Sequence, residues 1–172
     1  MFESVLVVLG GLPATGKSTV AQELIRESRC AYVRIDSVEQ ALRESGEMGL
    51  DGVQGAGYEA AYAVTRDLLR SGNRVLVECV NPIALTRDAW RKVATSSRSP
   101  IIEVELFCRD EAQHRERAET RVVNVRGLTL PDWGAIQSRE YEEWERAILR
   151  IDTSVTSPNE AAQQILALLP NI

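Results

Sequence analysis

The sequence predicts a three-layer α/β fold, in which helices cover both faces of a five-stranded, mostly parallel sheet. Five short apolar runs alternate with segments of helical periodicity along the whole chain, which is the order that a parallel sheet requires. The chain has 172 residues, 44% of them hydrophobic and 26% charged, which suits one buried core. We therefore expect a single domain over residues 1–172.

The expected strands are short and rich in Val, Leu and Ile, as in sheets that are buried on both faces. They are Ser4–Leu9, Ala31–Ile35, Arg74–Val80, Pro100–Cys108 and Ile148–Asp152. The expected helices repeat their apolar residues at intervals of three and four. They are Ser18–Glu27, Ser37–Glu44, Gly57–Arg70, Ala84–Thr95, Asp110–Arg121, Asp132–Ala147 and a last helix that runs to Leu169. A capping box with proline at the first helical position, Ser157-Pro158-Asn159-Glu160, opens that last helix.

The segment from Gly46 to Gly57 contains five glycines, and with so few apolar side chains it cannot form part of a core. This spacing predicts a flexible loop. The loop is either a plain connector or a segment that closes on a substrate.

The segment after the first expected strand is Gly11-Leu12-Pro13-Ala14-Thr15-Gly16-Lys17-Ser18, which satisfies the P-loop pattern G-x-x-x-x-G-K-[ST] in full. Its glycines let the backbone curl so that N–H groups surround a polyphosphate, and the following helix adds the positive end of its dipole. Lys17 then reaches the transferring phosphate and the Ser18 hydroxyl ligates Mg²⁺. Residues from Gly11 to Thr19 are therefore predicted to bind ATP. A chance match in a glycine-bearing turn would not explain the strand, loop and helix in this order.

With this motif early in a short chain, an arginine-bearing helix late on and an Asp-Thr pair before the last helix, the sequence resembles the P-loop kinase superfamily. Within it, the chain is most similar to predicted small kinases related to gluconate kinase, chloramphenicol phosphotransferase, zeta toxins and the polynucleotide kinase domain. The resemblance covers nearly the whole chain. It implies a P-loop NTPase fold, ATP and Mg²⁺ as cofactors, a lid over about residues 110–132 and a substrate loop over about residues 46–57.

Other P-loop classes fit this sequence less well. A GTPase would carry N-K-x-D, which the chain lacks, and an AAA-type motor needs a longer core and a helical lid domain. Adenylate kinases carry D-G-[FY]-P-R where this chain has Glu78-Cys79-Val80-Asn81-Pro82, and shikimate kinases carry a glycine run there. None of these templates assigns the phosphoryl acceptor.

Two carboxylates are candidates for the chemistry. Asp36 follows the second expected strand and can accept the proton of an attacking hydroxyl, as in the D-x-x-R motif of relatives, although Glu39 replaces that arginine here. The alternative is that Asp36 caps the following helix. Glu78 interrupts an apolar strand, which a role in holding a magnesium water would explain, and it can also act as the base. The alternatives for Glu78 are an edge position or a structural ion pair.

Arginines are frequent in and next to the helix Asp110–Arg121, and the resemblance implies that they neutralise charge on the phosphoryl group. We expect Arg117 and Arg121, which are four residues apart and share a helix face, to be catalytic. The alternative is a solvated helix held by salt bridges, because acidic residues interleave. His114 is expected to lie on the same mobile surface without a chemical role.

Two further features have an open interpretation. In relatives, the loop that begins here with Asp152 and Thr153 wraps around the adenine, and the alternative is a simple turn before the last helix. Trp133, Tyr141 and Trp144 have helical spacing, which is typical of core residues, although they could also line a substrate pocket.

Composition excludes several other functions. The net charge of −5 and the pI near 5.1 argue against binding to nucleic acid duplexes. Three widely spaced cysteines predict buried thiols rather than a disulfide or zinc site, and the single histidine excludes most metal and Ser-His schemes. The chain lacks an apolar segment of membrane-spanning length, so we expect a cytoplasmic protein.

The sequence thus predicts an ATP-dependent kinase that phosphorylates a hydroxyl of a small molecule. Two alternatives remain at this point. One is a kinase that acts on nucleotides or on polynucleotide 5′ ends, and the other is an ATP-binding regulator without a phosphoryl acceptor. The acceptor and the oligomeric state are left open.

Overall fold

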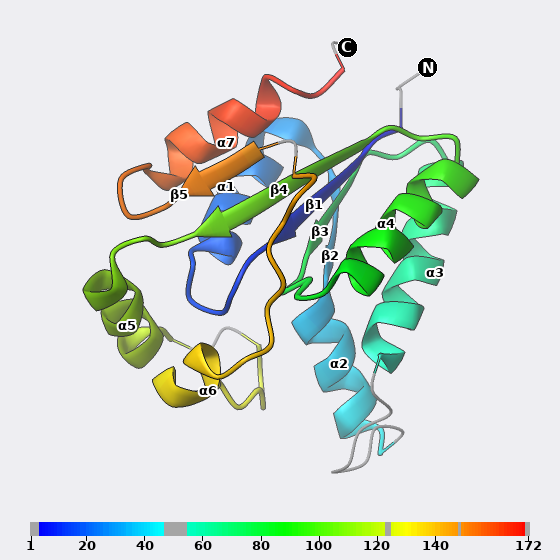
Figure 1. Ribbon diagram of the computed structural model, residues 1–172. Helices are drawn as coiled ribbons and strands as arrows, with labels where there is room; N and C mark the ends of the chain where they lie inside the picture. Colours follow the sequence, from blue (N-terminus) through cyan, green and yellow to red (C-terminus); the bar gives the residue numbers. More distant parts are fainter. Residues whose placement is uncertain (1–3, 47–54, 123–124, 148, 171–172) are drawn as a thin grey trace.

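A computed structural model provides the structure, which describes residues 4–46, 55–122, 125–147 and 149–170 (Figure 1). Five parallel strands form one sheet in the order β2-β3-β1-β4-β5. Their bounds are β1 Leu6–Gly10, β2 Ala31–Arg34, β3 Val75–Glu78, β4 Ile101–Phe107 and β5 Leu149–Asp152. The predicted fold class is confirmed, and all of these strands are parallel.

Helices cover both faces of the sheet (Figure 1). They are α1 Lys17–Ser28, α2 Ile35–Glu44, α3 Ala56–Arg70, α4 Ala84–Ser96, α5 Glu111–Thr120, α6 Trp133–Gln137 and α7 Pro158–Leu166. Side chains of β1 alternate between the two cores, as strand geometry requires. Val7 and Leu9 pack with α1 and α7, whereas Leu6 and Val8 pack with α3 and α4. The central strand is therefore buried on both faces.

The carboxyl ends of the strands lie at one edge of the sheet. The register pairs Glu78 at the end of β3 with Leu9 and Arg34, and it pairs Phe107 with Asp152. Helices α2, α5 and α6 lie beyond this edge, at the end to which the strand arrows point (Figure 1). Ligands of parallel α/β sheets bind at such an edge. The predicted substrate loop between Gly46 and Gly57 falls mostly on residues 47–54, which lie outside the described residues.

The predicted helix Asp132–Ala147 is wrong. Asp132 does cap a helix by accepting a hydrogen bond from Ala135 N at 2.8 Å, but that helix is α6 and it ends at Gln137. Beyond it, tertiary hydrogen bonds replace helical ones: Glu142 N donates to Pro82 O at 2.8 Å. The Arg87 guanidinium also donates to two carbonyl groups of this segment, those of Glu142 at 3.3 Å and Glu143 at 3.2 Å.

The aromatic residues that suggested a longer helix have other packing roles. Trp144 is 3% exposed and lies against Gly10, where a Cβ atom would come within 2.2 Å of the indole ring. Tyr141 is half-buried and its hydroxyl donates to Glu105 at 3.2 Å. A side chain of any size at position 10 would therefore displace the segment that leads to β5.

Smaller differences lie at the ends of elements. The last helix ends at Leu166 rather than Leu169, because Leu168 N and Leu169 N bond to carbonyl groups three residues earlier and tighten the last turn. The three cysteines are free thiols. Cys30 and Cys79 are buried as predicted, whereas Cys108 is only half-buried.

Candidate active site

The P-loop joins β1 to α1 at the carboxyl edge of the sheet. Gly11 has a φ of 145°, and a Cβ atom there would lie 2.1 Å from the Leu106 carbonyl oxygen, so that only glycine fits. Gly16 is the N-cap of α1 and has a φ of 91°. Because α1 begins at Lys17, the first N–H groups of the helix lie at the loop, where they can bind an anion.

Lys17 lies inside the cavity at this edge and is 8% exposed. Its ammonium donates to the carbonyl oxygens of Gly11 at 2.8 Å and Leu12 at 2.7 Å. Burial lowers the pKa of Lys17, whereas the carboxylates of Glu78 and Asp36 act in the opposite direction. Both candidate carboxylates, the predicted base Asp36 and the predicted magnesium ligand Glu78, thus act on the Lys17 charge.

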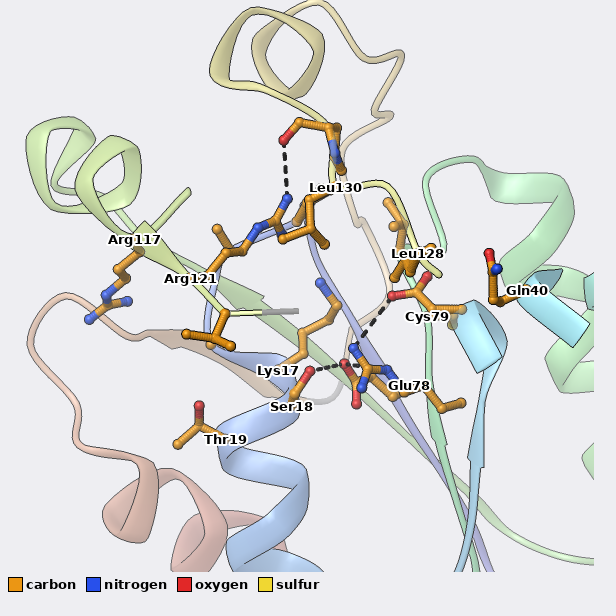
Figure 2. A pocket seen from close by; sticks show the side chains of 18 of the residues that line it. Lys17, Ser18, Thr19, Gln40, Glu78, Cys79, Arg117, Arg121, Leu128 and Leu130 are labelled. Carbon is orange, nitrogen blue, oxygen red and sulfur yellow. Dashed lines mark hydrogen bonds and ion pairs between the residues drawn. The ribbon is translucent and has the colours of Figure 1, made fainter. Parts of the chain in front are cut away.

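Glu78 is buried at the end of β3, where Ser18 Oγ donates to its carboxylate at 2.5 Å (Figure 2). The Tyr32 hydroxyl donates to Glu78 Oε2. Arg34 Nε lies 3.9 Å from Oε1, the oxygen that Ser18 contacts. Burial, followed by the Glu78 charge, raises the pKa of Tyr32, so the phenol remains a donor. The edge-position alternative for Glu78 is wrong, because β3 lies between β2 and β1. A structural ion pair with Arg34 accompanies the contact with Ser18.

The hydroxyl and carboxylate that we predicted to hold Mg²⁺ are therefore adjacent. Among the residues that the structure describes, no three His, Cys, Asp or Glu side chains form a metal cluster. Mg²⁺ binds to proteins chiefly through one or two protein oxygens, substrate phosphates and water. The pair of Ser18 and Glu78 fits that kind of site.

Asp36 lines the same cavity from the first turn of α2. Its side chain is 45% exposed, and Arg34 lies 3.6 Å from its carboxylate. The capping alternative is wrong, because α2 begins at Ile35 and its N-cap is Arg34, which has no side-chain cap. Asp36 therefore presents a partly solvated carboxylate to the cavity.

The two predicted catalytic arginines lie in different places (Figure 2). α5 ends at Thr120, and Arg121 follows in an extended conformation, so the prediction that it shares a helix face with Arg117 is wrong. Arg121 donates to the Pro131 carbonyl at 3.2 Å, and its charge interacts with Lys17 and Asp36. Burial lowers the pKa of Arg121, whereas Asp36 acts in the opposite direction.

Arg117 instead binds the loop after β5. Its guanidinium donates to Thr153 Oγ1 and to the Thr153 carbonyl oxygen, both at 2.9 Å. Thr153 Oγ1 also lies 2.9 Å from the carbonyl oxygen of Thr15 in the P-loop. The Asp152 carboxylate accepts from the N–H groups of Arg109 at 3.1 Å and Ser154 at 3.0 Å, so that it shapes the turn itself.

His114 was predicted to lie on the surface of the lid, and this prediction is also wrong. His114 is 6% exposed, and its Nε2 lies 2.8 Å from the Pro13 carbonyl oxygen of the P-loop. The Trp133 ring meets it edge-on, with centroids 5.0 Å apart and planes at 84°. α5 is charged all round and has no apolar stripe, so periodicity could not show that this side chain points inward.

The buried imidazole predicts a pH dependence of stability. Burial lowers the pKa of His114; the Pro13 carbonyl opposes this shift, whereas the charges of Lys17, Arg117 and Arg121 add to it. The folded state then binds this proton less readily than the unfolded state, whose histidine has a pKa of about 6.5. The contribution of His114 to the free energy of unfolding is therefore fully present above about pH 6.5, and it is lost as the pH falls below that value.

The measurement is the urea midpoint of unfolding between about pH 5.5 and 7, where histidine is the side chain that ordinarily titrates. Since His114 is the single histidine of the chain, His114→Gln should flatten the slope in this window. Equal slopes for the two proteins would contradict the prediction.

One cavity joins these groups, with a volume of about 1130 Å³. Pockets that take one drug-sized ligand have volumes of about 300–1,000 Å³, and this cavity lies just above the upper end of that range, as expected for a site that takes a nucleotide and a second small molecule. The cavity is lined by P-loop residues and by the predicted site residues Lys17, Ser18, Thr19, Asp36, Glu78, Arg117, Arg121 and Thr153.

A family model described as an AAA domain (AAA_33) matches residues 6–132. The chain belongs to this family. The match covers the P-loop, the strands β1 to β4 and the helices α1 to α5. The prediction against an AAA-type motor rested on the longer core and the helical lid domain that such a motor needs, and this match concerns neither.

Solved structures with the same fold include small kinases. APS kinase CysC of Mycobacterium tuberculosis, in complex with AMPPNP and APS, has a TM-score of 0.75 and 23% identity, covering 98% of each chain. A gluconokinase of Sinorhizobium meliloti has a TM-score of 0.66 and 19% identity, covering 97% of this chain and 92% of its own. A sugar kinase of Janibacter has a TM-score of 0.67 and 13% identity, covering 95% and 93%.

These likenesses show the P-loop NTPase-like α/β fold that the sequence predicted. None of the curated proteins matches the chain. In the part of the chain that the structure describes, the helices are too short or too polar to cross a membrane.

Proposed function

We propose that this protein is an ATP-dependent kinase that transfers the γ-phosphate to a hydroxyl of a small molecule. One observation carries the proposal: Lys17, Asp36, Glu78 and Arg121 line the same cavity at the carboxyl edge of the sheet, next to the P-loop. A phosphate cradle, a carboxylate base and a guanidinium are the groups that phosphoryl transfer needs. The kinases of the same fold, one of them in complex with AMPPNP, support this assignment.

In the proposed reaction, the triphosphate binds to the P-loop and the α1 N-terminus. Its β- and γ-phosphates replace the carbonyl groups of Gly11 and Leu12 as partners of the Lys17 ammonium. Arg121 neutralises the charge that develops on the γ-phosphoryl oxygens. These groups are already in place, so that positioning and electrostatics supply the acceleration.

The acceptor occupies the part of the cavity between α2 and residues 127–131. Its hydroxyl oxygen forms a bond to the γ-phosphorus as the bond from that phosphorus to the β–γ bridging oxygen breaks, so that ADP leaves. The hydroxyl proton passes to the Asp36 carboxylate. Asp36 suits this role because it is partly solvated and borders the cavity rather than the core.

Ser18 and Glu78 would hold Mg²⁺, which would neutralise charge on the phosphates of ATP. Tyr32 keeps the Glu78 carboxylate oriented toward Ser18. We expect Glu78→Gln to raise the Mg²⁺ concentration for half-maximal activity about 10-fold or more, since one charged ligand is lost. Mg²⁺ titrations of kinase activity and of the protein's intrinsic fluorescence give two independent readings.

Glu103→Gln is the matched control for that experiment. Glu103 is also a buried strand glutamate, but it lies opposite Val8 in the middle of the sheet and binds Arg91 at 2.7 Å. Its substitution should alter stability without altering the Mg²⁺ requirement. If both variants needed the same Mg²⁺ concentration as the natural protein, Glu78 would have no part in metal binding.

The direct test of the function is a screen for ATP consumption with a library of small hydroxyl compounds, in which the Lys17→Ala protein is the blank. A kinase consumes ATP in proportion to one acceptor and forms its phosphate ester. ATP binding without consumption for any compound would favour a regulator. Consumption only with nucleotides or polynucleotide 5′ ends, with a strong salt dependence, would favour the nucleic acid alternative.

A further inference from the structure

Side chains from three parts of the chain hold the carbonyl groups of the P-loop. Lys17 Nζ binds Gly11 O and Leu12 O, Thr153 Oγ1 lies 2.9 Å from Thr15 O, and His114 Nε2 lies 2.8 Å from Pro13 O. A P-loop binds phosphate with its N–H groups, so its carbonyl groups need partners on the opposite side. The loop is therefore shaped from outside as well as by its own sequence.

The peptide between Pro13 and Ala14 is the part of the loop that most needs such a partner. Ala14 has a φ of 65°, a left-handed conformation that is costly for a residue with a Cβ atom and persists only where its surroundings impose it. In a planar trans peptide, the C=O and N–H bonds point in opposite directions. A partner that holds the Pro13 oxygen on one side therefore directs the Ala14 N–H to the other, where Ala14 lines the cavity.

His114 is built into its position rather than resting on the surface. It is 6% exposed, and Trp133 fixes the plane of its ring by an edge-on contact. Gln137 of α6 donates to Glu111 of α5 at 2.9 Å, which ties together the two helices that carry the pair. Because a carbonyl oxygen can only accept, the imidazole must donate from Nε2.

We propose that His114 is a positioning residue, which holds the P-loop in its phosphate-binding shape by donating a hydrogen bond from Nε2 to the Pro13 carbonyl. The inference rests on the proposed function, in which this loop binds ATP. The hydrogen bond from His114 to Pro13 then stabilises the loop most when ATP is bound. Once the Lys17 ammonium turns to the phosphates, Gly11 O and Leu12 O lose it, whereas the contacts from His114 and Thr153 remain.

The experiment compares three substitutions in the full chain by calorimetric titration with ATP and Mg²⁺, together with the melting temperature. His114→Leu removes the donor. His114→Gln keeps a donor at nearly the same distance from the backbone as Nε2, and His114→Asn keeps the same amide but ends one carbon short. We expect the dissociation constant of ATP to rise about 5- to 10-fold for Leu and Asn, as for the loss of one hydrogen bond, and to stay within about twofold for Gln.

The Gln and Asn variants separate this role from packing. Recovery of ATP affinity by Gln and not by Asn, at similar melting temperatures, would support the proposal. Equal ATP affinity in all four proteins would overturn it, and so would equal weakening by Leu, Asn and Gln. If Leu does not fold, the comparison of Gln with Asn decides in the same way. A natural protein that gives no heat with ATP would overturn the proposed function as well, whereas normal binding with unaffected variants overturns this inference alone.

Discussion

Lys17→Ala should lower kcat/KM for phosphoryl transfer by about 10²–10³-fold, the cost of removing one preorganised charge donor from a transition state. The melting temperature should change by no more than about 2–4 °C, which corresponds to about 1 kcal/mol at this chain length. The small change in stability follows from two opposing effects. The variant loses the contacts of Lys17 Nζ with Gly11 O and Leu12 O, but it also loses a buried charge whose burial is unfavourable.

The chain provides its own control for this experiment, because it contains only one other lysine, Lys92. That residue is exposed on α4, away from the P-loop. Lys92→Ala removes the same charge and should leave kcat/KM within about twofold, as for a surface substitution. If Lys17→Ala transferred phosphate as fast as Lys92→Ala, the P-loop would not be the site of the reaction.

The sheet and the P-loop could be predicted because local patterns determine them. Strands of Val, Leu and Ile that are buried on both faces read directly as apolar runs, and the octapeptide after β1 has few structural alternatives. The segment 138–147 could not be predicted in the same way. Its backbone forms hydrogen bonds with Pro82 and Arg87, which lie more than 50 residues earlier in the chain. The spacing of its aromatic residues is typical of a helix, but these distant contacts determine its conformation.

The same distinction between local patterns and distant contacts applies to the candidate site. Lys17 and Ser18 lie within the motif, and Asp36 and Glu78 lie at or just beyond the carboxyl ends of strands. The parallel topology therefore brings all four to one edge. The positions of the arginines depend on where α5 ends, and the spacing of residues in the sequence does not show that the helix stops before Arg121. His114 was missed because its environment is made by Pro13 and Trp133, one far before it and one after it in the chain.

The sequence left open whether Asp36 or Glu78 accepts the proton of the acceptor, and the structure makes the two residues experimentally separable. Glu78 is 4% exposed and binds Ser18 and Tyr32, which leaves it little room for an incoming hydroxyl. Asp36 has a 45% exposed side chain, with Arg34 3.6 Å away. We therefore expect Asp36→Asn to lower kcat by about 10²–10⁴-fold, the usual contribution of a general base, while the dissociation constant of ATP stays unchanged.

Asparagine has the shape of aspartate, and Arg34 keeps its approach to Glu78, so stability should hold within about 0.5 kcal/mol. Asp67→Asn, on the exposed side of α3, removes the same charge far from the P-loop and is the matched control. The decisive comparison is made at saturating Mg²⁺, where a defect in metal binding is relieved but a missing base is not. If Glu78→Gln remained inactive there while Asp36→Asn turned over normally, the proton would pass to Glu78, and Asp36 would serve only to bind the acceptor.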